Sequence, residues 1–223
     1  GWVAGVALAG VLGLYYMERK IGPILTSGEK AEYHSRELVR YSFPLMLSGM
    51  VSIFLGWTDT AFLGYYMSES AVGLYNAAYP TAMLILLPVQ ALGSLTLTSF
   101  SKQNITDGDH AETLKTTARW VFALTFPAFL IMTLYSSELL HLLFGSEFAT
   151  AGTALAILAL GNMLGSTTGH IGDLMKARGH TKPIFYNNFA NIVLNIGLNI
   201  ALIPVLGIMG AAVATASSSV LMN

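Results

Sequence analysis

The sequence has no cysteine and few charged side chains. Without cysteine there is no disulfide framework, no thiol nucleophile and no cysteine-ligated metal site. Charged residues make up 10% of the chain, whereas a soluble domain has about 25%. The 11 basic and 12 acidic side chains nearly cancel, so no basic surplus indicates a nucleic-acid partner. Hydrophobic residues make up 54%, and this balance favours lipid as the solvent.

Long apolar runs recur along the chain. A membrane-spanning helix needs about 20 mostly apolar residues, and Pro204 and Gly207 divide the last long run in two. The resulting segments are Gly1 to Met17, Tyr41 to Met67, Ser70 to Ser101, Trp120 to Ser137, Phe148 to Gly172, Pro183 to Ile203 and Ile208 to Asn223. We predict an all-α polytopic membrane bundle, and we expect the first and last segments to be incomplete.

The basic residues fall in alternate gaps between these segments. Cytoplasmic loops keep lysine and arginine, whereas short translocated loops lack them. The three basic gaps contain Arg19, Lys20, Lys30, Arg36 and Arg40; Lys102, Lys115 and Arg119; and Lys176, Arg178 and Lys182. The pattern predicts a protein of the cytoplasmic membrane, with residues 18–36, 102–119 and 176–182 on the cytoplasmic side and very short outer loops.

One polar stretch is long enough to separate two parts of the chain. It runs from residue 18 to 36 and contains Gly22, Pro23 and Gly28, which interrupt regular structure. We predict that residues 1–17 end a transmembrane helix of an amino-terminal lobe and that 18–36 are a cytoplasmic linker. Residues 37–223 then form a carboxy-terminal transmembrane lobe. The short apolar segment from Glu138 to Phe144 is expected to lie in the outer interface.

Asp59 is an acidic residue well inside an apolar run. An ionisable side chain at that depth usually faces the protein interior or a watery cavity. Ser48, Ser52 and Gly56 are expected to share its helix face. Two interpretations stay open: a proton or cation site, or a hydrogen-bonded packing residue near the outer mouth.

Asparagines repeat every four residues along a later run, as Asn187, Asn191, Asn195 and Asn199, with Asn188 beside the first. This spacing predicts a polar stripe on one helix face. The amides could line a cavity for sugar, because they donate and accept hydrogen bonds without the cost of a buried charge. They could equally bond neighbouring helices together. Gln90 is a further candidate cavity residue.

Glycines repeat with the same period of four at Gly161, Gly165 and Gly169. Small residues at this spacing let another helix approach closely, so helix packing is the favoured interpretation. Enzyme motifs are missing: the sequence has no HExxH, Walker loop, GxGxxG or GxSxG. The short outer loops also leave little room for a catalytic domain. We therefore expect a transporter and not an enzyme, without a metal site or a cofactor.

Four stretches resemble a known family, and they cover nearly everything from Glu37 onward. They are LVRYSFPLMLSGMVSIFLGWTDTAFLGYYM, SAVGLYNAAYP, LLHLLFGSEFATAGTALAILALGNML and ALIPVLGIMGAAVATASS. They are similar to the carboxy-terminal half of the oligosaccharide and polysaccharide flippases of the multidrug, oligosaccharidyl-lipid and polysaccharide exporter superfamily. The resemblance implies one six-helix lobe of a two-lobed transporter of about 12–14 helices.

The resemblance also implies a function. Polyprenol-linked saccharides would cross the membrane by alternating access for cell-surface polysaccharide biosynthesis, with membrane lipid as partner and H⁺ or Na⁺ as a possible coupling ion. It places Asp59 where the family often has an acidic residue. No lysine or arginine lies inside a predicted span to neutralise a lipid phosphate. That phosphate would then stay near Arg40, Lys102 or Lys182, or meet a cation of the missing half.

Other functions compete with this one. A cation-coupled multidrug exporter of the same superfamily would use Asp59 for coupling, and a lipid-linked peptidoglycan precursor flippase is a closer relative still. The asparagine stripe favours sugar. From a different class, a membrane-embedded glycan polymerase or glycosyltransferase would be expected to have long outer loops with carboxylates, and a non-transporting scaffold subunit is the remaining alternative.

Overall fold

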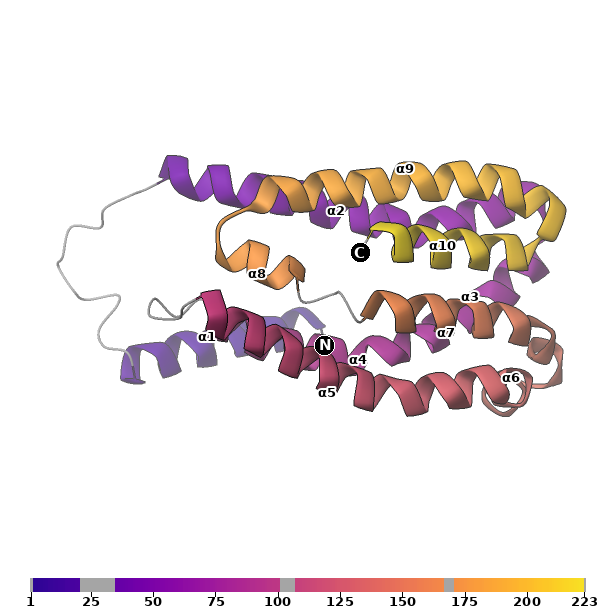
Figure 1. Cartoon of the computed structure of the whole chain (residues 1–223), viewed down its shortest axis with the longest axis horizontal. Helices are drawn as coiled ribbons and strands as arrows, with labels where there is room; N and C mark the ends of the chain where they lie inside the picture. Colours follow the sequence, from indigo (N-terminus) through magenta and orange to yellow (C-terminus); the bar gives the residue numbers. More distant parts are fainter. Residues whose placement is uncertain (1, 21–34, 101–106, 167–170, 223) are drawn as a thin grey trace. The chain divides into compact units, whose positions relative to one another are not determined.

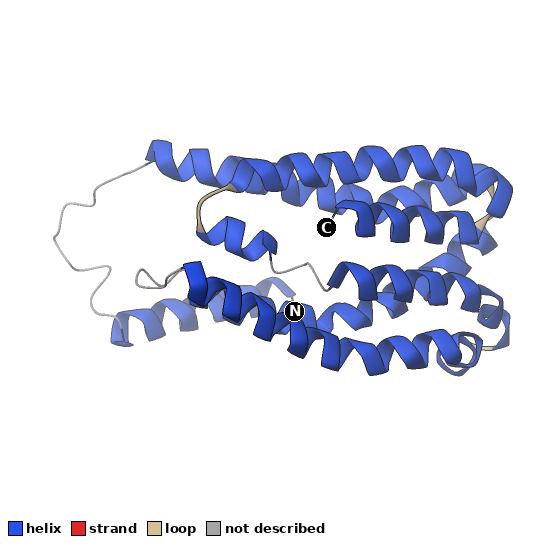
Figure 2. Ribbon diagram, in the orientation of Figure 1, coloured by secondary structure: helices blue, strands red, loops and turns tan. Residues whose placement is uncertain are grey.

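The computed structural model describes residues 2–20, 35–100, 107–166 and 171–222. These residues form α-helices and two short 3₁₀ helices, and the described ranges contain no strand (Figure 2). The predicted all-α membrane bundle is thereby confirmed. The chain divides into two compact units, Gly1–Glu37 and Leu38–Asn223, which are described separately.

The first unit contains helix α1, Trp2–Lys20. The helix extends past the apolar run and takes in Glu18, Arg19 and Lys20, which the sequence had assigned to the linker. Most of the predicted linker, residues 21–34, lies outside the described residues. The assignment of residues 1–17 to an amino-terminal lobe stays a prediction.

The second unit is a bundle of antiparallel helices joined mostly by short turns (Figure 1). Its elements are α2 (Ser35–Tyr66), α3 (Glu69–Met83), η1 (Leu84–Leu86), α4 (Leu87–Phe100), α5 (Asp107–Leu134), α6 (Ser136–Phe144), η2 (Ser146–Ala151), α7 (Gly152–Ser166), α8 (Ile171–Ala177), α9 (Thr181–Leu206) and α10 (Ile208–Met222). Residues 67–68 connect α2 to α3, and a tight turn at Gly207 joins α9 and α10, which pack against each other as a hairpin. Gly207 adopts φ of 58°, a conformation that glycine takes without the steric penalty of a Cβ atom.

Five helices in the described residues are long and apolar enough to cross a membrane. They are Arg36–Tyr66, Glu69–Gly93, Glu112–Leu134, Ser146–Ser166 and Thr181–Leu206, and the shorter apolar helix Ile208–Leu221 follows them. Many of their large apolar side chains are exposed, including Phe54, Trp57 and Val205. Such a surface is stable against lipid tails, so the chain is a multi-pass membrane protein.

One predicted segment is displaced. The sequence predicted a span from Trp120 to Ser137 after a polar loop, but helix α5 begins at Asp107 and ends at Leu134. Residues 107–119 are therefore helical. Lys115 and Arg119 lie in the first turns of the spanning helix Glu112–Leu134. Charged residues are tolerated there because their long side chains can reach polar surroundings.

The predicted span Ser70 to Ser101 is interrupted at η1. Pro88 has no backbone N–H and its ring conflicts with the carbonyl four residues earlier, which disrupts a regular helix. Near this break, Asn162 of α7 donates a hydrogen bond of 2.9 Å from Nδ2 to the carbonyl oxygen of Ala82. The irregular backbone is thus buried against a polar partner and not against lipid.

Helix α7 packs against α3, α5 and α10. Gly161 makes the last of these contacts possible, since a Cβ atom added there would lie 2.6 Å from the Cα atom of Ala216. Gly165 is buried on the same helix, and Gly169 lies outside the described residues. The main apolar core gathers around α3 and α7, with fully buried Leu63, Tyr75, Leu140, Leu155, Leu158 and Ile203.

Candidate functional site

Asp59 lies at the meeting point of four helices of the second unit. Its side chain is 3% exposed, although α2 as a whole is mostly exposed along its length. The neighbouring side chains come from α3, α9 and α10. The sequence correctly placed this carboxylate in the protein interior, as expected for an ionisable group inside an apolar helix.

Four hydrogen bonds fill both carboxylate oxygens of Asp59. Oδ1 accepts from Asn199 Nδ2 at 2.7 Å and from Asn195 Nδ2 at 3.4 Å. Oδ2 accepts from the hydroxyl groups of Tyr75 and Thr215. We call these five residues the Asp59 cluster. All four donors are uncharged, so protein dipoles solvate the carboxylate.

The period of four in α9 builds one side of the cluster. Asn195 and Asn199 are both fully buried and one turn apart, and Asn199 Nδ2 also donates to Asn195 Oδ1 at 3.0 Å. Asn195 Nδ2 further donates to Thr215 Oγ1 at 3.1 Å. The amides therefore bond to each other and to α10, which fixes their orientation toward Asp59.

Two amide oxygens of α9, one of them in the Asp59 cluster, accept no hydrogen bond within the described residues. They are Asn199 Oδ1, next to the carboxylate, and Asn191 Oδ1, two turns earlier on α9. Both are buried. A buried acceptor without a donor is costly, at about 1–3 kcal/mol, and such groups in a native protein call for an explanation.

A second polar contact joins α2 and α9 about three turns from Asp59. Asn188 Nδ2 donates to Ser48 Oγ at 2.5 Å and to Ser52 Oγ at 3.4 Å. Ser48 is buried, whereas Ser52 and Gly56 are exposed, so only part of the predicted Asp59 face is turned inward. Polar side chains thus connect these two helices at two depths.

The other candidate residues lie apart from the cluster. Gln90 is exposed on α4, and Arg40 and Lys182 are exposed near the starts of α2 and α9. Lys102 lies outside the described residues. The structure therefore brings together Asp59, Asn195 and Asn199 but does not bring Gln90 to them.

Sequence reasoning missed Tyr75 and Thr215, which supply two of the four donors. Tyr75 is 1% exposed and stacks on Tyr79, one turn later, with ring centroids 5.7 Å apart. The two tyrosines stand four residues apart in SAVGLYNAAYP, and this spacing on one helix face could have indicated them. Thr215 stands among small residues in ATASSS, where nothing distinguishes a ligand of the carboxylate from a packing residue.

The side chains of the Asp59 cluster are suited to binding a ligand through hydrogen bonds. No group of three or more histidine or acidic side chains that could hold a metal ion occurs within the described part of the chain. Amide and hydroxyl groups can both donate and accept, and the carboxylate accepts only. The set can therefore bind hydroxyl-bearing or cationic ligands once its internal bonds open.

The sequence of this chain matches a protein family. The family described as polysaccharide biosynthesis protein matches residues 6–152, more than half of the chain. The chain belongs to this family. The predicted resemblance to polysaccharide flippases is confirmed.

Two relatives from Haloferax volcanii show the same relation. The chain is 31% identical over 201 residues to the probable low-salt glycan biosynthesis flippase Agl15, covering 89% of this chain and 43% of that protein. It is 28% identical over 170 residues to the probable flippase AglR, covering 74% of this chain and 36% of that protein. The chain thus spans less than half the length of these curated relatives.

The fold has a solved counterpart in a transporter. A crystal structure of a MATE mutant matches this family member with a TM-score of 0.75 at 14% sequence identity. The match covers 96% of this chain and 50% of that one. The helix arrangement is therefore that of MATE proteins.

Proposed function

We propose that this chain is part of a flippase that moves polyprenol-linked saccharides across the cytoplasmic membrane by alternating access. The Asp59 cluster carries the proposal, because it concentrates hydrogen-bonding groups inside a bundle whose outer surface is apolar. The relative Agl15 is named a probable glycan biosynthesis flippase and AglR a probable flippase, and both names support the same function. The MATE-like fold supports transport.

The asparagine stripe gives the cluster its suitability for sugar. Asn191, Asn195 and Asn199 present both N–H donors and carbonyl acceptors, which match the hydroxyl groups of a saccharide. In this structure Asn195 and Asn199 bond to each other and to Asp59, and Asn195 also bonds to Thr215. Transport would exchange these internal bonds for bonds to the passing headgroup.

Asp59 is the proposed site of a coupling cation, H⁺ or Na⁺. Its carboxylate lies beside the unpartnered oxygen of Asn199, and oxygen atoms are the ligands that hard cations prefer. A cation there would compete with the amide and hydroxyl donors for the carboxylate. Cation binding would thereby loosen α2 from α9 and α10, and this links the ion to a helix movement.

A cation-coupled drug exporter is the second candidate function. The MATE fold and the buried carboxylate favour it, because a buried carboxylate can attract a cationic drug as well as an ion. A peptidoglycan precursor flippase would use the same polar groups for a different lipid-linked sugar. Both alternatives predict different substrates, so transport assays separate them.

The test uses the full-length protein in liposomes. We would measure transbilayer movement of a fluorescent polyprenol-pyrophosphate oligosaccharide for wild type, Asp59→Asn and Asn195→Leu. Thr58→Val is the matched control, because its hydroxyl bonds to the carbonyl of Phe54 within its own helix at 2.8 Å. We expect wild type and Thr58→Val to move the substrate and both cluster variants to lose at least about tenfold in rate, the loss expected from one to two charged-group hydrogen bonds.

The outcomes separate the candidates. Export of a cationic dye by wild type without movement of the saccharide would replace the proposal with a drug exporter. Full activity of folded Asn195→Leu would remove the stripe from the path. Sodium and pH gradients imposed separately would identify the coupling ion, and a rate independent of both would exclude coupling at Asp59.

A further inference from the structure

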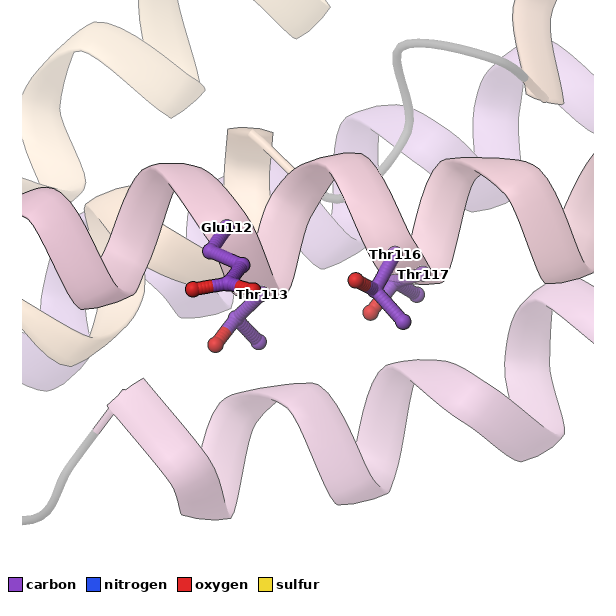
Figure 3. A pocket seen from close by; sticks show the side chains of 4 residues that line it. All are labelled: Glu112, Thr113, Thr116 and Thr117. Atoms are coloured by element: carbon purple, nitrogen blue, oxygen red, sulfur yellow. The ribbon is translucent and has the colours of Figure 1, made fainter.

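A second polar site lies in the first turns of α5, far along the chain from the Asp59 cluster. A cavity of about 300 Å³ is lined there by Glu112, Thr113, Thr116 and Thr117. Figure 3 shows these four side chains extending from the same side of the helix. We call it the α5 cavity. The lining side chains that the structure describes are polar and lie at the start of a helix that is apolar enough to cross a membrane.

The spacing of the four residues explains this arrangement. Positions i, i+1, i+4 and i+5 fall on one face of an α-helix. One carboxylate and three hydroxyl groups therefore share a face. A helix face that packs into an apolar core or faces lipid tails would be apolar. The four residues therefore mark a face that meets polar surroundings, and Glu112 and Thr116 are exposed on it.

The three threonine hydroxyls are unusual in their hydrogen bonding. Thr58, Thr81 and Thr125 each donate to a backbone carbonyl one turn earlier in their own helix, at 2.7–2.8 Å. Such bonds are the usual solution for threonine inside an apolar helix. Within the described residues, the hydroxyls of the α5 cavity make no such bond, which leaves them open to water or to a ligand.

Two cations flank the cavity on the same helix. Lys115 and Arg119 are exposed, and each lies three residues after a lining residue, Glu112 and Thr116 respectively. Side chains three residues apart are neighbours on a helix surface. The site therefore combines a hydroxyl and carboxylate surface with positive charge at its border, and the charge suits a phosphate group.

We propose that the α5 cavity binds the first sugar of the lipid-linked substrate while Lys115 and Arg119 hold its phosphate. Small-molecule sites have volumes of about 300–1,000 Å³. The α5 cavity lies at the lower end of this range, a volume that suits a single sugar and not a whole glycan. Glu112 accepts hydrogen bonds from sugar hydroxyls, and the threonines donate and accept. This inference rests on the proposed flippase function and adds a headgroup site distinct from the Asp59 cluster.

The position of the site assigns it a step in transport. It lies at the end of α5 that carries the basic residues, the end predicted to face the cytoplasm. The phosphate of a lipid-linked sugar stays near the membrane surface while its tail remains in lipid. The α5 cavity would therefore collect the headgroup before it enters the bundle, and it would determine affinity more than the rate of crossing.

Binding is the direct test. Full-length protein in lipid nanodiscs would be titrated with a short-chain polyprenyl phosphate that carries one hexose, and with the same polyprenyl phosphate without the sugar. The variants are the isosteric pair Thr113→Val with Thr116→Val, Glu112→Gln, and Thr58→Val as control. We expect the threonine pair and Glu112→Gln to weaken binding of the hexose lipid about tenfold and to leave the sugar-free lipid unchanged.

Other outcomes overturn the inference in identifiable ways. Equal weakening for both lipids would assign the cavity to the phosphate alone. Loss of binding in competition with phosphatidylethanolamine, without a difference between the two polyprenyl lipids, would assign it to an ammonium headgroup. Unchanged binding and unchanged flipping in the variants would remove the site but leave the flippase function standing. Normal sugar-dependent binding without flipping by wild type would contradict the proposed function and leave the site standing.

Discussion

Asn199 of α9 donates from Nδ2 to Asp59 Oδ1 of α2 at 2.7 Å, across 140 positions of sequence. This bond joins the two residues that stand out most in the sequence, an intramembrane carboxylate and a member of the asparagine stripe. It also uses a donor of a side chain whose own oxygen has no partner in the described structure. The pair therefore couples the position of α9 to the state of Asp59.

Replacing Asn199 by leucine is expected to destabilise the protein. The change removes a hydrogen bond of 2.7 Å to a buried carboxylate, and hydrogen bonds to charged groups contribute about 1.5–3 kcal/mol. Thermal unfolding in detergent would show a lowered midpoint. Asn76→Leu on α3 is the matched control, because it removes only an exposed hydrogen bond, which Asn76 Oδ1 accepts from Thr60 Oγ1 at 3.2 Å. An equal effect of both changes would contradict the role of the cluster.

Tyr75→Phe is expected to remove one donor to Asp59 without disturbing the core. The ring remains stacked on Tyr79, so the packing is retained and only the hydroxyl bond is lost. The expected cost is about 1–3 kcal/mol, because one lone-pair site of a buried carboxylate is left empty. Unfolding in urea or heat would measure it. A neutral result would mean that Thr215, Asn195 and Asn199 satisfy Asp59 by themselves.

Gly161→Ala is expected to force α7 and α10 apart. A Cβ atom at position 161 would lie 2.6 Å from the Cα atom of Ala216, and overpacking of this kind costs about 1–3 kcal/mol. Gly197→Ala in α9 is the comparison, since a Cβ atom there meets nothing within 4 Å and alanine favours a helix by about 1 kcal/mol. The two variants should therefore shift the unfolding midpoint in opposite directions.

Asn162→Leu is expected to weaken the contact between α7 and the break in the α3–α4 span. Its Nδ2 donates to the carbonyl oxygen of Ala82, and a buried carbonyl left without this donor costs about 1–3 kcal/mol. Hydrogen exchange of the amides around η1 would report the local opening. Unchanged exchange there, with normal exchange elsewhere, would show that the backbone at η1 is satisfied without α7.

The sequence was sufficient to predict the helical membrane bundle and the interior position of Asp59. The reason is energetic: an apolar run of about 20 residues has few alternatives to a membrane helix, and a carboxylate inside it cannot face lipid cheaply. The asparagine stripe followed from periodicity. Each of these predictions depends on the residue pattern within a single helix and not on how the helices pack together.

The donors from other helices could not be predicted in the same way. Thr215 and Tyr75 belong to residue types that are common in membrane helices for several reasons, and only the packing of α3 and α10 against α2 assigns them to Asp59. The early start of α5 was missed because Lys115 and Arg119 were taken as loop residues, although charged side chains continue a helix well. The α5 cavity was hidden by the same assumption.

The α9–α10 hairpin has a consequence for how the Asp59 cluster opens. Its turn at Gly207 holds two helices together, and those helices supply three of the four donors, from Asn195, Asn199 and Thr215. A displacement of the hairpin away from α2 therefore removes three bonds in one movement and leaves the carboxylate with Tyr75 alone. A partial displacement of the hairpin would break some hydrogen bonds to Asp59 without making room for a ligand or ion at the carboxylate. Asp59 is thus expected to change its surroundings cooperatively, between a fully bonded and a largely stripped state.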